Sequence, residues 1–278
     1  PRASVERIAV RSARVTLRGM EPISVSADAQ FGNDGGVIKA TVKLSDGTLA
    51  VDIVPNGTNA ALSVRGSRFT SPVGPAYVFD NLDLTATVTT TQLSDIKAEG
   101  TIMGGKFKAD GQARYGSGIT VDGRFIVENI NIEPLLGLFI GGVSITGAAD
   151  LQGAFALRAD SIPNLFSQDR VEFRFSGSRG TINNVDLIRA AQSAARDGVR
   201  GGRTRFNTIS GTVSVAGNRA SFQQVRIDSD SMNAAGSFDV LPKGELSGRM
   251  NIQVGPKGRP VAAGSVGVFG DVRNPVLK

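Results

Sequence analysis

Residues 246–254 read LSGRMNIQV, and apolar and polar side chains alternate along them with a period of two. In an extended chain Met250 and Ile252 point to one side, and Ser247 and Arg249 point to the other. Alternation of this kind predicts a strand of an antiparallel sheet that has one apolar face and one face in water.

The same alternation runs through most of the chain, and turns rich in Gly, Asn and Asp interrupt it. Asp46-Gly47 and Asn56-Gly57 each separate two alternating runs, which is typical of β-hairpins. The chain has 35 glycines in 278 residues, as expected where many tight turns occur. We therefore expect a mainly β fold, a long curved antiparallel sheet that forms a β-groove, with two or three short helices in the second half.

Three segments of the second half have helical patterns. Residues 131–140 place Pro134 in a first helical turn, and residues 161–166 follow Ser161, a residue type that often caps helices. Residues 185–197 have apolar side chains at helical spacing, and Gly198 is expected to close that helix.

The onset of these helical patterns suggests how the chain is organised. We expect residues 1–128 to form a strand-only β-meander and residues 129–278 to form a segment with short helices and closing strands. The two segments can belong to one continuous sheet. The apolar helix expected at 135–140 could cap the end of a groove or pack in a core, and insertion into a bilayer interface is a third interpretation.

The composition excludes several kinds of catalysis. The chain has no Cys and no His, which rules out zinc sites built on thiolate or imidazole, Cys nucleophiles and Ser-His-Asp triads. Acidic residues do not cluster beyond turn positions, so paired-carboxylate catalysis lacks support as well. Asp228 and Asp230 are spaced as in a calcium loop, but the sixth-position Gly and the distal Glu are missing, so a hairpin turn is the better interpretation. We expect no enzyme, no cofactor and no metal.

The net charge of +6 and the pI of about 10.0 suit an anionic partner such as a membrane surface, and they suit an ordinary solubilising surface equally well. The basic residues are dispersed and aromatic residues are few, so we expect no nucleic-acid binding. Arginines concentrate around 189–205, where they could contact lipid headgroups or form a solvated helix end. The headgroup candidates are Arg196, Arg200 and Arg203.

No run of about 20 apolar residues is present, so we expect no membrane-spanning helix in this sequence. The sequence begins at Pro1 and enters a strand pattern directly. We expect it to be part of a longer protein that carries an anchor or signal elsewhere.

Five stretches of the second half resemble the C-terminal region of the AsmA family in their order and spacing. They are FSGSRGTINNVDLIR (175–189), TRFNTISGTV (204–213), GNRASFQQVRI (217–227), MNAAGSFDV (232–240) and VGVFGDVRNP (266–275). The resemblance extends over residues 120–275, and that family is similar to bridge-like lipid transfer proteins with repeating β-grooves. It implies a periplasmic body tethered to the inner membrane by an N-terminal helix. It also implies a role in phospholipid movement toward the outer membrane or in envelope homeostasis.

An apolar groove could hold acyl chains, because each buried CH₂ contributes about 0.8 kcal/mol. We therefore predict a non-enzymatic lipid-binding or lipid-transfer segment whose partners are phospholipid or another acyl lipid, a membrane surface and an envelope protein. The candidate lining residues are Val121, Phe125, Leu151, Phe155, Val171, Phe173, Phe175, Phe222, Phe238, Met250, Ile252 and Val266. Each of them could instead belong to a closed core. The alternative functions are a structural or protein-interaction β module in envelope assembly, built as an elongated sandwich or solenoid, and an enzyme that acts on envelope polysaccharide.

Overall fold

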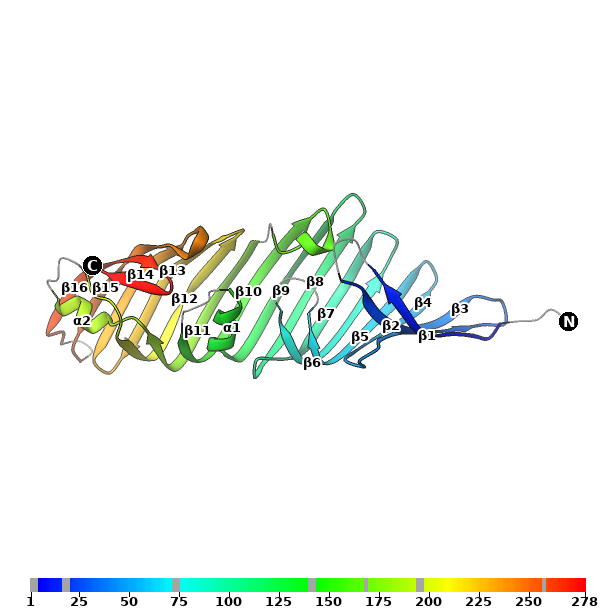
Figure 1. Cartoon of the computed structure of the whole chain (residues 1–278), viewed down its shortest axis with the longest axis horizontal. Coiled ribbons are helices and arrows are strands. Elements are labelled where there is room, and N and C mark those ends of the chain that lie inside the picture. Colours follow the sequence, from blue (N-terminus) through cyan, green and yellow to red (C-terminus); the bar gives the residue numbers. More distant parts are fainter. Residues whose placement is uncertain are drawn as a thin grey trace. The chain divides into compact units, whose positions relative to one another are not determined.

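The computed structural model describes residues 5–16, 21–71, 76–139, 144–167, 170–193, 198–256 and 259–278. The described strands form one 17-stranded antiparallel open sheet, in which successive strands of the chain lie side by side (Figure 1). Two short α-helices belong to the second half. The mainly β antiparallel fold predicted from the alternation is confirmed.

The chain divides into two compact units. Unit 1 comprises Pro1–Ile102, Lys106–Phe125 and Ala156–Gln168, and unit 2 comprises Met103–Gly105, Ile126–Phe155 and Asp169–Lys278. The strands that lie mostly or wholly in unit 1 are β1 (Arg7–Val15), β2 (Ile23–Phe31), β3 (Val37–Leu44), β4 (Leu49–Asn56), β5 (Asn59–Thr70), β6 (Val78–Val88), β7 (Gln92–Ile102) and β8 (Gly105–Tyr115). Residues of β9 (Ile119–Asn131) and β10 (Ile145–Ala159) contribute to both units.

Unit 2 holds the remaining strands and both α-helices. Its strands are β11 (Arg170–Asn183), β12 (Arg203–Ala216), β13 (Arg219–Ser229), β14 (Met232–Val240), β15 (Leu246–Val254), β16 (Ala262–Asp271) and β17 (Asn274–Leu277). The α-helices are α1 (Ile132–Phe139) and α2 (Leu187–Gln192). A 3-10 turn, η1 (Ile162–Asn164), belongs to unit 1, and a second one, η2 (Pro242–Gly244), belongs to unit 2.

The strand register places like residues on like faces. Between β5 and β6, Val64 pairs with Leu84 on the apolar face, whereas Ser63 pairs with Thr85 on the polar face. The stretch quoted first is β15, in which Met250 and Ile252 are buried while Ser247 and Arg249 are exposed. Side-chain alternation thus sets both the strand positions and the face that each residue occupies.

Several strands break the alternation at a bulge. On β13 the register shifts between Phe222 and Val225, and Gln224 has a φ of 52°. The extra residue returns Val225 to the apolar face three positions after Phe222, and a bulge of this kind also increases the local twist. Within strands β5, β7, β9 and β11, non-glycine residues again adopt positive φ: Arg68, Asp95, Asn129 and Arg179.

The first two predicted helices are short. Helix α1 begins at Ile132 and has Pro134 in its first turn, as expected. Residues 162–164 form only a 3-10 turn. Ser161 occupies its N-cap position as predicted, but the Ser161 hydroxyl donates to Asp160 Oδ1 at 3.1 Å and makes no capping hydrogen bond.

Helix α2 is shorter than the predicted span of 185–197. It begins after Asp186, whose carboxylate accepts from the Arg189 N–H at 2.9 Å. The Thr204 hydroxyl donates to the Val185 carbonyl at 2.7 Å, which occupies that carbonyl outside the helix. Ser193 is already extended, so the helix does not reach Gly198, and residues 194–197 lie outside the described part.

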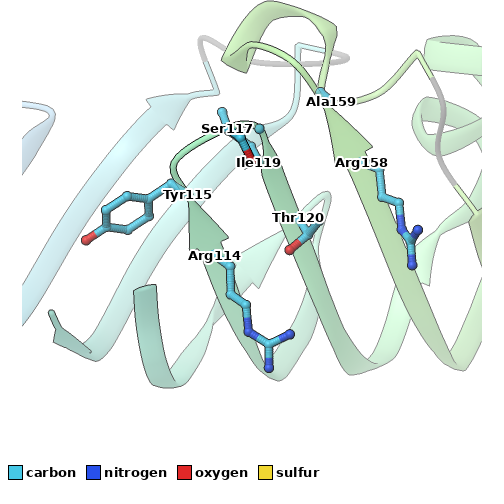
Figure 2. Close-up of a pocket in the computed structure, with 8 residues that line it drawn as sticks. Arg114, Tyr115, Ser117, Ile119, Thr120, Arg158 and Ala159 are labelled. Atoms are coloured by element: carbon cyan, nitrogen blue, oxygen red, sulfur yellow. The ribbon is translucent and has the colours of Figure 1, made fainter. Parts of the chain in front are cut away.

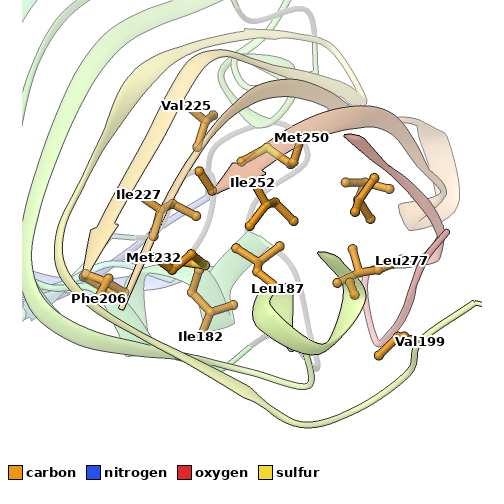
Figure 3. Packing of buried hydrophobic residues seen from close by; sticks show 14 of the residues in the cluster. Ile182, Leu187, Val199, Phe206, Val225, Ile227, Met232, Met250, Ile252 and Leu277 are labelled. Carbon is orange, nitrogen blue, oxygen red and sulfur yellow. The ribbon is translucent and has the colours of Figure 1, made fainter. Parts of the chain in front are cut away.

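Unit 2 has a closed hydrophobic core. Leu187 of α2 contacts a cluster that includes Phe206, Met232 and Ile252, with exposed fractions of 3%, 0% and 1% (Figure 3). Helix α2 packs against β12, β15 and β16, and so covers the apolar face of these strands. No helix within the described residues has both the length and the apolar character to cross a membrane.

Candidate functional site

The candidate site is the apolar face of unit 1, which is the sheet face formed by alternate residues of β4 to β8. Its larger side chains are half-buried, namely Leu49, Val51, Ile53, Leu62, Val64, Phe69, Phe79, Leu84, Leu93, Ile96 and Phe107. Leu82, Ala86, Ile102 and Ala113 are buried on the same face. This face therefore offers a continuous set of apolar side chains, most of which are only half-buried.

A row of aromatic rings crosses this face. The ring centroids of Phe69 and Phe79 lie 6.5 Å apart, and those of Phe79 and Phe107 lie 5.4 Å apart. Phe79 is on β6 and Phe107 is on β8, so strand β7 lies between them. Neighbouring strands are about 4.8 Å apart, so these two rings meet only by leaning over the intervening strand.

Gly100 on β7 makes room for this contact. A Cβ atom added to Gly100 would lie 2.9 Å from Phe107 Cε1 and would collide with the Asn81 carbonyl oxygen. A strand glycine with no space for a side chain marks a close approach of another group. We call this arrangement, in which a ring lies over a glycine of the adjacent strand, a ring-over-glycine contact.

Unit 2 repeats the arrangement on its own apolar face. Phe175 on β11 pairs with Gly211 on β12, where an added Cβ would lie 2.8 Å from Phe175 Cε1. Phe222 and Phe238 pair directly across β13 and β14, and their rings stack with centroids 4.6 Å apart and an interplanar angle of 10°. Rings arranged in this way add a large apolar area to the face.

The structure divides the twelve predicted lining residues into two groups. Nine are half-buried: Val121 and Phe125 in unit 1, and Leu151, Phe155, Val171, Phe173, Phe175, Phe222 and Phe238 in unit 2. Met250, Ile252 and Val266 are 3%, 1% and 4% exposed and belong to the closed core of unit 2. The closed-core alternative therefore describes these three residues best, and they are not available to a ligand.

Two of the three predicted headgroup residues lie within the described part of the chain. Arg200 and Arg203 are exposed, and Arg203 begins β12 opposite Asn183 of β11. Arg196 lies outside the described residues. Their contact with headgroups remains a prediction.

Sequence reasoning missed the ring row of Phe69, Phe79 and Phe107. Phe79 stands three residues before Leu82, so strict alternation assigns the two to opposite faces, but the register shifts between Phe79 and Asn81 and returns both to one face. The Phe79–Leu82 spacing, followed by regular alternation, was the available signal of this bulge.

Two carboxyl groups with lowered pKa values, Asp52 and Asp239, alternate with residues of the apolar faces and so lie on the opposite face of the sheet. The Asp52 carboxylate accepts from the Thr41 hydroxyl at 2.6 Å, and this bond, together with Lys39 and Arg65, lowers the pKa of Asp52 below its usual value. A hydrogen bond from Ser221 and the charge of Arg219 likewise lower the pKa of Asp239. The described residues contain no group of three or more side chains suited to holding a metal ion.

The described residues of the apolar faces therefore offer apolar surface and aromatic rings rather than reactive groups. In comparisons with known proteins, no family model, no curated protein and no solved structure matches this chain.

Proposed function

We propose that this chain is a non-enzymatic lipid-binding segment that holds the acyl chains of phospholipid on the apolar face of unit 1. One observation carries the proposal: the row of Phe69, Phe79 and Phe107 on a face of half-buried apolar side chains. Within the described residues, both α-helices belong to unit 2, where α2 packs on β12, β15 and β16.

The energetics of burial favour an acyl ligand. A chain of about 16 carbons that becomes fully buried gains on the order of 10 kcal/mol, at about 0.8 kcal/mol for each CH₂. The face has no deep polar anchor, and a smooth apolar surface lets such a chain shift along it. Transfer of lipid, as distinct from storage, fits this property.

We further propose that the protein acts in the periplasm as an AsmA-like protein, anchored in the inner membrane by a segment outside this sequence. There it would conduct phospholipid toward the outer membrane, alone or with an envelope protein partner. The order of the strand and glycine motifs between residues 175 and 275 supports this placement. The charge of +6 is compatible with work beside anionic membrane surfaces.

Native mass spectrometry of the purified protein, with lipid extraction from the same sample, tests the proposal. Co-purifying phospholipid in near-stoichiometric amount is the expected result and would name the cargo. A clean apo mass that persists after incubation with phospholipid would overturn the proposal.

A site-specific test uses neighbouring residues of β6 that face opposite ways. A photo-crosslinking p-benzoylphenylalanine in place of Phe79 keeps an aromatic ring on the half-buried face, whereas the same group in place of Val78, which is 45% exposed, reports on the other face. We expect crosslinks to added phospholipid at position 79 and few at position 78. Equal yields at both positions would contradict a ligand on the apolar face.

A structural or protein-interaction module is the second candidate, and the closed core of unit 2 favours it. Met232 and Ile252 are packed as in any stable domain and leave no surface for a ligand. This candidate predicts that lipid is absent and that glutamate at Phe79 impairs only folding. Retention of fold with loss of lipid in Phe79→Glu, and retention of both in Val78→Glu, would exclude it.

A further inference from the structure

A shallow hollow of about 300 Å³ opens at the hairpin between β8 and β9 in unit 1. It is lined by Arg114, Tyr115, Ser117, Gly118, Ile119, Thr120, Arg158 and Ala159. Figure 2 shows the Arg114 and Arg158 side chains extending the same way from their strands, with Thr120 on the strand between them. Thr120 alternates with Ile119 and Val121, and Arg114 and Arg158 each follow a buried apolar residue, so these three polar side chains belong to the polar face of the sheet.

The charges around the hollow do not balance. Arg124 pairs with Asp110 at 3.1 Å, and Gln112 donates to Asp122 at 2.9 Å, so the carboxylates of β8 and of the unit 1 part of β9 have other partners. Asp160 accepts from Asn164 Nδ2 at 3.0 Å.

Arg114 and Arg158 are both exposed. Neither belongs to any of the ion pairs formed among the described residues. Two guanidinium groups thus line one hollow with no ion-paired carboxylate among the described residues, and an anion between them would relieve their mutual repulsion.

We propose that this hollow binds a phosphate group. A guanidinium presents a planar fork of N–H donors that matches two phosphate oxygens, and two such forks can grip one phosphate from two sides. The hydroxyls of Ser117 and Thr120 also line the hollow and can each donate a further hydrogen bond. The phosphate belongs either to a lipid headgroup or to a small soluble phosphate compound, and the recognition chemistry is the same.

This site goes beyond the proposed acyl-chain function and does not depend on it, because a phosphate needs no apolar face. The test therefore uses ligands with and without acyl chains. One arm titrates inorganic phosphate and glycerol 3-phosphate into the whole chain by calorimetry, and the other measures co-sedimentation with phosphatidylglycerol vesicles against phosphatidylcholine vesicles.

The variants are Arg114→Gln, Arg158→Gln and the double substitution, with Lys108→Gln as control. Lys108 is exposed on the same strand as Arg114 and does not line the hollow, so the control removes one positive charge elsewhere on the strand. We expect each arginine substitution to weaken binding about tenfold, the worth of a lost charge-assisted pair, and the control to change it less than about twofold. All three side chains are exposed and each is replaced by polar glutamine, and circular dichroism checks that the fold is kept.

Binding of the soluble phosphates with this variant pattern supports the site and assigns it to a small ligand. Binding of phosphatidylglycerol vesicles alone, with the same pattern, supports the site and assigns it to a headgroup. Absence of binding in both arms overturns the proposal, as does a loss in Lys108→Gln equal to that in the arginine variants. Failure of the acyl-chain experiments at Phe79 would leave these outcomes unchanged, so the two proposals fail separately.

Discussion

The apolar face of unit 1 and the closed core of unit 2 arise from the same alternating pattern and differ in what covers them. In unit 2, α2 covers part of β12, β15 and β16, and Ile252 is 1% exposed. In unit 1, Ile96 also lies on the apolar face of its strand, β7, but it is only half-buried. A single pattern therefore yields a core or an available surface, depending on whether the chain supplies a covering element.

The largest expected effect compares one substitution in the two regions. Ile252→Ala should lower the free energy of unfolding by about 2–5 kcal/mol, because it leaves a cavity in a packed core. Ile96→Ala should cost about 1 kcal/mol, since its surroundings are already partly open to solvent. Urea unfolding measures both, and equal losses would show that the face of unit 1 is covered as fully as the core.

Substitution of a strand glycine should have the same effect in the two regions, because each region contains a glycine that leaves no room for a side chain. An added Cβ at Gly100 in unit 1 would collide with the Asn81 carbonyl oxygen, and at Gly236 in unit 2 with that of Arg249. We expect Gly100→Ala and Gly236→Ala each to destabilise by about 1–3 kcal/mol through overpacking. Ala235→Ser, at an exposed neighbour of Gly236, is the control and should be nearly neutral in thermal unfolding. A neutral Gly100→Ala would mean that β6 and β7 can separate at little cost.

The covering helix offers a sharper test of unit 2. The buried Thr204 hydroxyl accepts from the Leu187 N–H at 3.1 Å and donates to the Val185 carbonyl, so it ties the start of α2 to β12. Thr204→Val should cost about 1–3 kcal/mol, because two buried backbone groups lose their partner. Hydrogen exchange at Leu187 and Ala190 should accelerate, whereas Thr208→Val, an exposed position of the same strand, should leave it unchanged. Unaltered exchange in Thr204→Val would show that packing alone holds the helix.

The smallest expected effect concerns acid stability in unit 1. The folded-state pKa of Asp52 is lowered, so its contribution is present above the unfolded-state pKa of about 3.9 and is lost as the pH falls through the folded value. Asp52→Asn should therefore cost at most about 1 kcal/mol at neutral pH, the usual range for an ion pair near the surface. Below pH 4 the variant and the parent chain should converge in thermal stability. Asp80→Asn, at an exposed position of β6, serves as control, and a gap that widens at low pH would contradict this account.

The alternation of apolar and polar residues predicted the strands well, because in a half-buried strand the residue types alone indicate which side faces solvent. Strand β15 is the clearest case, with both its limits and its faces as expected. The pattern did not show that Met250 and Ile252 are covered, because the covering residue Leu187 is distant in the chain. It also placed the start of α2 too early, because a hydroxyl from β12 binds the Val185 carbonyl just before the helix. Strict alternation fails as well at the bulge beside Phe79, where the register shifts.

The ring-over-glycine contacts have an evolutionary consequence. Strands β11 and β12 form two such contacts, and each strand supplies the ring of one and the glycine of the other. Phe175 of β11 lies opposite Gly211, and Phe206 of β12 lies opposite Gly180. In each pair the phenylalanine ring fills the space above both positions. A larger residue at the glycine would therefore displace the ring, and a smaller residue at the phenylalanine would leave a cavity. The two positions are therefore expected to mutate in compensation, large for small and small for large, and the exchanged pair Phe175→Gly with Gly211→Phe should be tolerated better than either single change.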